Sequence, residues 1–411
     1  MSKTPLVALA LISILAACSS ADNDAGSDAA AVTSPTAALV TSTSAADTTD
    51  VQTSETTDVE TTEVETTEAE STDAVTTVAD TTPVESTDTT ETATTETDTT
   101  TDSTETDTTT AGGADEPLTI QELLDLGRPI VLAHGGGEDQ YPHSTPYAYG
   151  ESVKAGVDML DFDVQLTADG VLVVQHDDDT GRTTDADLPI NDTDYADLAK
   201  LDNAYWFTDE CTCTGRPDAA YTLRGIRTGD VPPPAGYTPE DFIIPRFEDI
   251  VERFPNMPLN IEIKGSGGYA IYAAYEVARV LTDHDRLANA VVTSFDDLVV
   301  DAFHELAPDV EVTPGLSLSS AFILNGKPLP EGMRILQLPP EFEGIDVLTP
   351  EHIAASHAAG YVIWVWPNDH AFENPNGYTG FLEAGMDGLN INYPADGVDA
   401  VRKFAGLDGT D

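Results

Sequence analysis

Short apolar runs that alternate with segments of helical pattern constrain the fold of this chain more than any other feature. The eight runs are Pro129–His134, Met159–Val164, Leu259–Lys264, Ala290–Phe295, Val310–Leu316, Arg334–Leu338, Val362–Pro367 and Asp387–Ile391. Segments such as Pro146–Ala155 and Tyr269–Leu281, which follow the first and third runs, have helical patterns. Eight strand–helix units predict an α/β fold over residues 116–411, a TIM (β/α)8 barrel.

One further strand-like run, Val171–His176, does not belong to these eight units. Only Thr167–Gly170 separates it from the second strand, which is too short for a parallel crossover but suits a hairpin. We therefore expect this run to fold back antiparallel on the second strand. The spacing predicts that His176 lies roughly opposite Asp163.

Residues 178–244, approximately, interrupt the barrel pattern after this hairpin. The stretch contains a proline run, Pro232–Pro234, and an aromatic run, Tyr205–Phe207. It is predicted to be an insertion over the barrel mouth, where it would influence substrate selectivity. Cys211 and Cys213 lie within it, and both a local disulfide and two free thiols remain open.

The N-terminus has the features of a secretory signal. Lys3 precedes an apolar run, Leu6–Ala17, that is too short to span a bilayer as a stable helix. The run ends in Leu-Ala-Ala followed by Cys18, which resembles the lipobox of bacterial lipoproteins. That resemblance implies a signal peptide over residues 1–17 and a diacylglyceryl group on Cys18. The alternative is an ordinary cleaved signal in which Cys18 is incidental.

Residues 18–115 have a different composition from the rest of the chain. Residues 19–115 are mostly Thr, Ser, Asp, Glu, Ala and Val, and contain no aromatic residue, Lys or Arg. Such a segment buries too little apolar surface to offset its ordering entropy, which predicts a disordered acidic stalk. With the lipid anchor, the stalk predicts an extracytoplasmic protein attached to the bacterial cell membrane.

The charge of the C-terminal part excludes some partners. Residues 19–115 hold 23 of the 74 acidic residues; the other 51 face 16 of the 17 Lys and Arg residues, a net charge of −35. A domain this acidic repels polyanions, which argues against nucleic acid as a partner. The membrane is expected as a partner only through the Cys18 anchor.

Six polar residues stand at or near the carboxyl ends of strands, where barrel enzymes carry their chemistry. They are His134, Asp161, Asp163, His176, Glu262 and Lys264. Spacing by two places Asp161 and Asp163 on one face of their strand, with the apolar Phe162 on the other. Buried acids without a cation are costly, so this arrangement favours a bound ion.

These residue types suit the cleavage of a phosphodiester. Oxygen ligands select a hard divalent ion, Ca²⁺ or Mg²⁺. A cation together with Lys264 suits a phosphate, and two histidines suit a general acid and a general base. The expected partner is therefore a small-molecule phosphodiester substrate.

In this context the folded part resembles the glycerophosphodiester phosphodiesterase family. The stretches that carry the resemblance are Ala133–Gly136, Pro142–Thr145, Asp161–Gly170, Val173–Asp177, Arg182–Thr184, Ile261–Lys264, Ser294–Phe295, Trp366 and Gly385–Gly388. Together they span essentially the whole folded domain and none of the stalk.

The resemblance implies a role for each matching residue. His134 and His176 correspond to the acid/base pair, and the metal ligands correspond to Asp161, Asp163 and Glu262. Lys264 and Trp366 correspond to phosphate or substrate contacts. The implied reaction begins with attack of a glycerol hydroxyl on phosphorus, and water then opens the cyclic product to give glycerol phosphate and an alcohol.

Three positions depart from the family pattern. Gly135 stands where the family usually has an arginine, so a bidentate phosphate contact is missing. His143 replaces the glutamate of the family's Pro-Glu-Asn-Thr, and Asp161 replaces a glutamate ligand. His143 is expected at the rim of the site, the alternative being that it helps to bind phosphate.

Two other functions remain open. One is a phospholipase D-like activity on lysophospholipids, which would require an apolar groove in the insertion around Tyr205–Phe207. The other is a non-catalytic surface lipoprotein that binds ligands on a degenerate barrel, which the glycine at position 135 favours and the intact histidine and carboxylate set opposes.

Overall fold

The computed structural model describes residues 117–407. The predicted signal peptide, the anchor residue Cys18 and the predicted stalk lie outside the described residues. Within residues 117–407, no helix is long and apolar enough to cross a membrane.

Eight parallel strands form the centre of the domain. They are β1 (Ile130–Ala133), β2 (Met159–Leu166), β4 (Leu259–Ile263), β5 (Ala290–Thr293), β6 (Glu311–Val312), β7 (Ile335–Leu338), β10 (Val362–Val365) and β11 (Gly388–Ile391). They pair in the order β6-β5-β4-β2-β1-β11-β10-β7. The result is a nearly closed barrel. Seven of these strands fall within the predicted runs, and β2 continues two residues beyond its run, which confirms the predicted fold.

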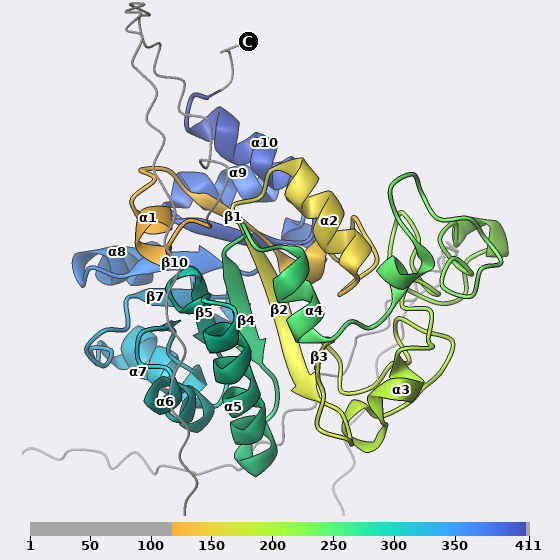
Figure 1. The fold of residues 1–411 in the computed structure, drawn as a ribbon. Helices are drawn as coiled ribbons and strands as arrows, with labels where there is room; N and C mark the ends of the chain where they lie inside the picture. Colours follow the sequence, from red (N-terminus) through yellow and green to blue (C-terminus); the bar gives the residue numbers. More distant parts are fainter. Residues whose placement is uncertain (1–116, 408–411) are drawn as a thin grey trace, which may run out of the picture. The chain divides into compact units, whose positions relative to one another are not determined.

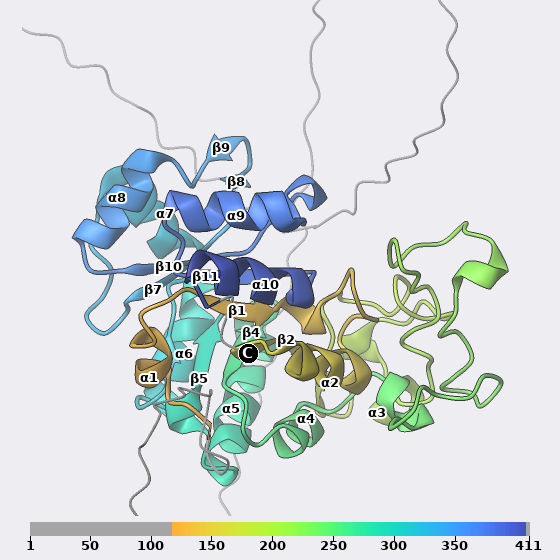
Figure 2. The same cartoon turned by 90° about the horizontal axis from the view of Figure 1, so that it is seen from above.

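Helices surround these strands, as Figure 2 shows from above. They are α1 (Ile120–Leu124), α2 (Pro146–Ala155), α4 (Phe247–Arg253), α5 (Gly267–Asp283), α6 (Asp297–Leu306), α7 (Leu316–Asn325), α8 (Pro350–Ala358), α9 (Pro375–Ala384) and α10 (Pro394–Phe404). The bounds of α2 match the prediction because Thr145 caps its first turn and Gly156, with a positive φ, ends it. Helix α5 extends the predicted segment by two residues at each end.

One further strand of the sheet, β3 (Leu172–Val174), lies outside the barrel order and pairs antiparallel with β2, as predicted. Its register differs from the prediction by one residue. Val174 lies opposite Val164, and the backbone N–H of Gln175 donates to the carbonyl of Asp163 at 2.9 Å. The hairpin closes between Thr167 and Val171, so Gln175 rather than His176 faces Asp163. His176 follows in a bend beyond the strand.

The alternation along β2 separates the core from the barrel interior. Leu160, Phe162 and Val164 are buried in the main apolar cluster, as the spacing predicted. The buried side chains of Asp161 and Asp163 lie on the opposite face. Asp161 accepts a hydrogen bond from Asn260 on β4 at 2.5 Å. Polar residues therefore continue from β2 across the interior of the barrel.

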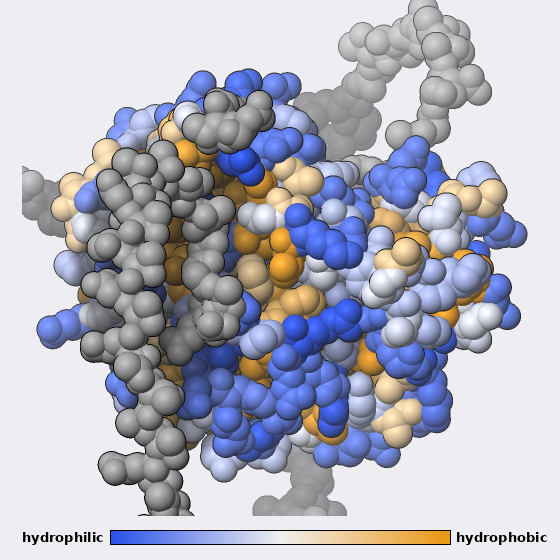
Figure 3. Space-filling model, turned by 45° about the horizontal axis from the view of Figure 1, so that its top comes forward, coloured by the Kyte–Doolittle hydropathy of each residue, from blue (hydrophilic) through white to orange (hydrophobic). Residues whose placement is uncertain are grey.

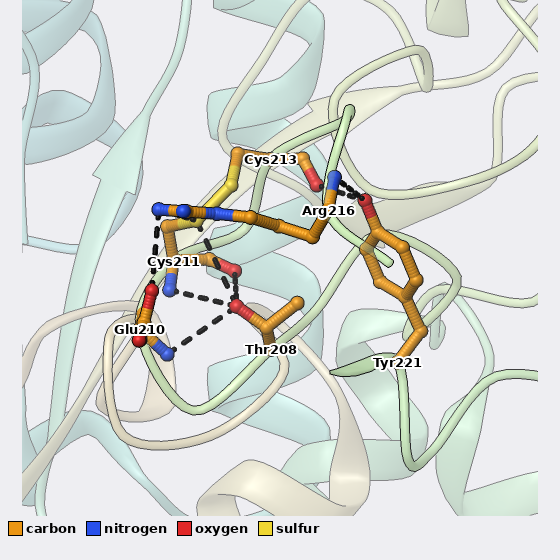
Figure 4. Close-up of a disulfide and its surroundings, with 6 residues drawn as sticks. All are labelled: Thr208, Glu210, Cys211, Cys213, Arg216 and Tyr221. Carbon is orange, nitrogen blue, oxygen red and sulfur yellow. Dashed lines mark hydrogen bonds and ion pairs between the residues drawn. A yellow bond between two sulfur atoms is a disulfide. The ribbon is translucent and has the colours of Figure 1, made fainter. Parts of the chain in front are cut away.

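The stretch 178–244 contains only short elements and lies to one side of the barrel in both ribbon views (Figures 1 and 2). These elements are η2 (Ile190–Asp192), α3 (Tyr195–Leu198), η3 (Asp218–Ala220) and η4 (Pro239–Phe242). Cys211 and Cys213 form a disulfide, which resolves the open alternative (Figure 4). The Thr208 hydroxyl donates to the Cys211 carbonyl at 2.9 Å and the Tyr221 hydroxyl to the Cys213 carbonyl at 3.1 Å, so hydrogen bonds hold both sides of the bridge.

The aromatic run of this stretch packs within the stretch itself. The guanidinium of Arg224 lies 4.2 Å from the ring centre of Tyr205 and 4.7 Å from that of Trp206. Trp206 also packs edge-to-face against Tyr221. These rings are therefore occupied by local contacts.

On the face of the domain drawn in Figure 3, hydrophilic residues surround smaller apolar patches.

Candidate active site

Barrel topology brings the predicted site residues to the carboxyl ends of β1, β2 and β4. His134 directly follows β1 in the short helix η1 (His134–Gly136). His176 enters from the bend after β3, and its ring centre lies 6.4 Å from that of His134, nearly perpendicular to it. The two predicted acid/base residues, 42 positions apart in the chain, are thus neighbours in the fold.

The three predicted ligand carboxylates come from adjacent strands. Asp163 on β2 stands directly beside Glu262 on β4 in the strand register. Lys264 lies between their side chains, with its Nζ 3.4 Å from Asp163 Oδ1 and 3.2 Å from Glu262 Oε1. Burial raises the pKa of Asp161, with the charge of Asp163 adding to the effect. Burial acts on Asp163 too, but the positive charges of Lys264 and, to a lesser degree, of the nearby histidines together outweigh it and lower that pKa.

These carboxylates fit a divalent cation in chemistry. The Oδ2 atom of Asp163 is buried and has no hydrogen-bond partner among residues 117–407. A buried carboxylate oxygen without a donor is costly, and a cation would satisfy it. The side chains do not by themselves form a closed cage, since no group of three or more His, Cys, Asp or Glu residues within the described range is arranged to hold an ion.

His134 is held by a residue that the sequence did not single out. Its Nδ1 lies 2.8 Å from the side-chain oxygen of Asn392, which follows β11. Burial alone would lower the pKa of His134, but the negative charges of Glu138, Asp161 and Asp163 outweigh it and raise the pKa to about 9. These negative charges therefore favour the protonated form of the ring.

His176 is held by a chain of charged groups. Its Nδ1 lies 2.7 Å from Asp177 Oδ1. Arg182 donates from Nε to Asp177 Oδ2 at 2.6 Å and from Nη2 to Asp177 Oδ1 at 3.2 Å. The Nη1 of Arg182 also lies 3.6 Å from Glu138 Oε2. Arg182 and Glu138 are site residues that sequence reasoning missed, although Arg182 stood in one of the resembling stretches.

The expectation that His143 lies at the rim is wrong, because its side chain is completely buried. Its ring lies 5.8 Å from that of His176, and its Nε2 is 3.2 Å from Glu138 Oε2. Burial, aided by the positive charge of Arg182, lowers the pKa of His143 to about 3, so the ring is neutral at neutral pH.

The burial of His143 depends on Gly135. A Cβ added at position 135 would lie 2.5 Å from His143 Nε2 and 2.7 Å from its Cδ2. No side chain fits at position 135 while this ring stays in place. The two departures from the family pattern therefore belong together, because the ring of His143 can occupy its position only if residue 135 is a glycine.

We predict that Gly135→Ala destabilises the protein by about 3 kcal/mol, through overpacking against His143 and a strained positive φ of 51°. The free energy of unfolding from denaturant titration measures the effect. Gly326→Ala is the matched control, because Gly326 has φ 65° and ψ 22° and its added Cβ would meet nothing within 4 Å. Equal losses in the two variants would contradict the packing argument.

The predicted substrate contact Trp366 directly follows β10 and belongs to an aromatic group at the barrel mouth. Its ring centre lies 6.1 Å from that of Phe295, which in turn lies 6.5 Å from Phe342. Phe295 is 44% exposed. The mouth therefore has a charged side, near the histidines, and an apolar side.

A barrel that carries a facing histidine pair beside carboxylates and a partly buried lysine has the features of an enzyme that cleaves phosphate esters. The comparison with protein families agrees. Residues 134–396 match the model of the Glycerophosphoryl diester phosphodiesterase family, and the chain belongs to this family.

Curated relatives span most of the folded part. A glycerophosphodiester phosphodiesterase of Bacillus subtilis is 23% identical over 279 residues, 66% of this chain and 86% of the relative. One from Bacillus altitudinis is 26% identical over 273 residues, 64% of this chain and 94% of the relative. A human lysophospholipase D is 30% identical over 152 residues, 36% of this chain and 40% of the relative.

Among solved structures, an Oleispira antarctica phosphodiesterase in complex with the product sn-glycerol-3-phosphate superposes with a TM-score of 0.51 at 20% identity. The match covers 68% of this chain and 98% of that chain. At this level of identity the likeness shows the fold alone.

Proposed function

We propose that this protein hydrolyses glycerophosphodiesters to glycerol phosphate and an alcohol. The observation that carries the proposal is the facing pair of His134 and His176, with ring centres 6.4 Å apart, beside the cluster of Asp163, Glu262 and Lys264. Membership of the family and its glycerophosphodiester phosphodiesterases from two bacilli support the substrate class.

The two histidines suit a proton transfer in each direction. One ring accepts the proton of the oxygen that attacks phosphorus, and the other donates a proton to the alcohol oxygen that leaves. One P–O bond forms and one breaks, so the pair ends with the same total number of protons. The rings come from separate loops and their centres lie 6.4 Å apart, so both can contact one phosphate group.

We further propose that Asp161, Asp163 and Glu262 hold a divalent cation, Ca²⁺ or Mg²⁺. When bound, the ion neutralises charge that develops on the phosphate oxygens. The unpartnered Asp163 Oδ2 supports this assignment. Burial opposes the charged form of Lys264, but Glu262 and Asp163 outweigh it and raise its pKa, so Lys264 supplies a permanent positive charge for the phosphate.

An assay of the purified full chain tests the proposal. Glycerophosphocholine and glycerophosphoglycerol would each be incubated with added Mg²⁺ or Ca²⁺, and released glycerol phosphate measured. We expect release from at least one of them. No release under either cation would sink the hydrolase proposal and favour the non-catalytic binding lipoprotein.

A second candidate substrate is a lysophospholipid cleaved by a phospholipase D-like reaction. The rings of Tyr205 and Trp206, where a groove for it was expected, are occupied by local contacts, and the apolar side of the mouth offers the surface instead. The group formed by Phe295, Phe342 and Trp366 offers aromatic surface for an acyl chain. The human lysophospholipase D among the relatives agrees with this candidate. A kcat/KM for lysophosphatidylcholine well above that for glycerophosphocholine would select it, and the reverse order would reject it.

We also propose that Cys18 carries a lipid that anchors the protein outside the cytoplasm. The supporting feature is the lipobox-like sequence that ends at Cys18. We predict that Cys18→Ser moves the protein from the membrane fraction to the soluble fraction of a bacterial host and abolishes its labelling by a radioactive fatty acid. Unchanged labelling of the variant would contradict the anchor.

A further inference from the structure

We propose that Asn392 is a positioning residue, which fixes the tautomer and the orientation of His134 so that Nε2 faces the substrate. The catalytic consequence rests on the proposed hydrolysis, whereas the tautomer itself does not. Asn392 follows β11, the last strand of the barrel, and lies 258 positions after His134 in the chain.

The backbone and burial of Asn392 hold it firmly at the barrel mouth. Its exposed fraction is 4%, and its backbone N–H donates to Glu373 Oε2 at 3.0 Å. The Tyr378 hydroxyl donates to the same oxygen at 2.5 Å. A side chain placed in this way has little freedom to follow a moving partner, so it can orient the group that it contacts.

The partners of the Asn392 amide determine which way it points. Its Nδ2 lies 3.1 Å from Glu138 Oε1 and 2.9 Å from Asp139 Oδ2. Ionised carboxylates only accept hydrogen bonds, so the NH₂ group must face them. The amide oxygen must then face His134, where it lies 2.8 Å from Nδ1.

This orientation dictates the tautomer of the histidine. An amide oxygen cannot donate, so Nδ1 of His134 carries the hydrogen of this bond. In the neutral ring the lone pair is therefore on Nε2, for which no hydrogen bond is present within residues 117–407. His176 is arranged in parallel, with Nδ1 on Asp177. Both rings are thus held through Nδ1 and leave Nε2 for chemistry.

Two variants of the full chain separate positioning from simple support. Asn392→Ala removes the acceptor, and Asn392→Asp keeps an oxygen for Nδ1 while it loses the donors to Glu138 and Asp139. Asn325→Ala, at the exposed end of α7, is the control. Nitrogen NMR of the labelled imidazoles reports the tautomer in alkaline solution, where the imidazoles are neutral. The spectrum of His134→Ala identifies the His134 signals among those of the 8 histidines.

We expect Asn392→Ala to shift the neutral ring toward the Nε2–H form and to lower kcat about a hundredfold, with KM changed less than about threefold. Asn392→Asp should keep the Nδ1–H form and a kcat closer to that of the wild type. If Asn392→Ala does not fold, the proposal is tested by the tautomer of His134 in the wild type and in Asn392→Asp, both of which should show the Nδ1–H form.

An Nε2–H tautomer in the wild type overturns the proposal. So does an Asn392→Ala variant that keeps both the Nδ1–H form and the wild-type kcat. A wild-type protein without activity on any diester would refute the proposed function alone, since the tautomer is measured without substrate.

Discussion

His176→Ala is expected to lower kcat for glycerophosphodiester hydrolysis about a thousandfold, with a much smaller change in KM. The ring packs edge-to-face against both His134 and His143. Asp177 holds it through Nδ1, and Arg182 donates two hydrogen bonds to Asp177. An imidazole that transfers a proton acts in the transition state rather than in ground-state binding, so its loss should lower kcat more than it raises KM. Steady-state kinetics with the best diester substrate measure both constants.

His304→Ala is the matched control for this variant, because His304 is an exposed residue of α6. It should retain wild-type kcat, and unfolding curves should confirm that both variants are folded. A His176→Ala protein that is folded and keeps more than about a tenth of the wild-type kcat would exclude His176 as an acid or base.

Asp163→Asn is expected to lower kcat by a similar factor, about a thousandfold, and to weaken binding of the divalent cation. Asp163 is buried, stands beside Glu262 in the strand register and has one oxygen without a partner among the described residues. The amide keeps the shape but removes the charge that a hard cation requires. Activity measured against Mg²⁺ or Ca²⁺ concentration gives both effects.

Treatment with EDTA provides the complementary measurement on the wild-type protein. We expect activity to disappear and to return when excess Mg²⁺ or Ca²⁺ is added. Asp301→Asn, an exposed change on α6, should respond like the wild type. Full activity in EDTA would refute the cation, and the pairing of Lys264 with Asp163 and Glu262 would then account for the charge balance of the cluster.

The glycine at position 135 looked, in the sequence, like the simple loss of a phosphate-binding arginine. The structure shows that the ring of His143 occupies the space that a side chain at position 135 would need. It also places another guanidinium, that of Arg182, beside Glu138 and Asp177. Which side chain fits at a position depends on the residues packed around it, and the sequence does not show which residues those are.

Local patterns predicted a large part of the fold correctly. Strand periodicity placed Asp161 and Asp163 on the inner face of β2, because side chains alternate strictly along a strand. The short loop before β3 required an antiparallel hairpin, and the prediction placed His176 within one residue of the position opposite Asp163. The exact register was not predicted, because the pair that closes a loop depends on turn geometry.

The sequence by itself thus determined the eight barrel strands, the hairpin arm after the second of them and the six residues proposed for the chemistry. It did so because strand and helix periods, and the position of active sites at carboxyl ends of barrel strands, are local or general rules. It did not predict the short hairpin of Glu341–Phe342 and Ile345–Asp346. Only the tertiary structure decided that Asn392 holds His134, that Arg182 clamps Asp177, and that His143 is buried. These contacts form where separate loops of a nearly closed barrel meet, and their geometry depends on the packing of the whole domain.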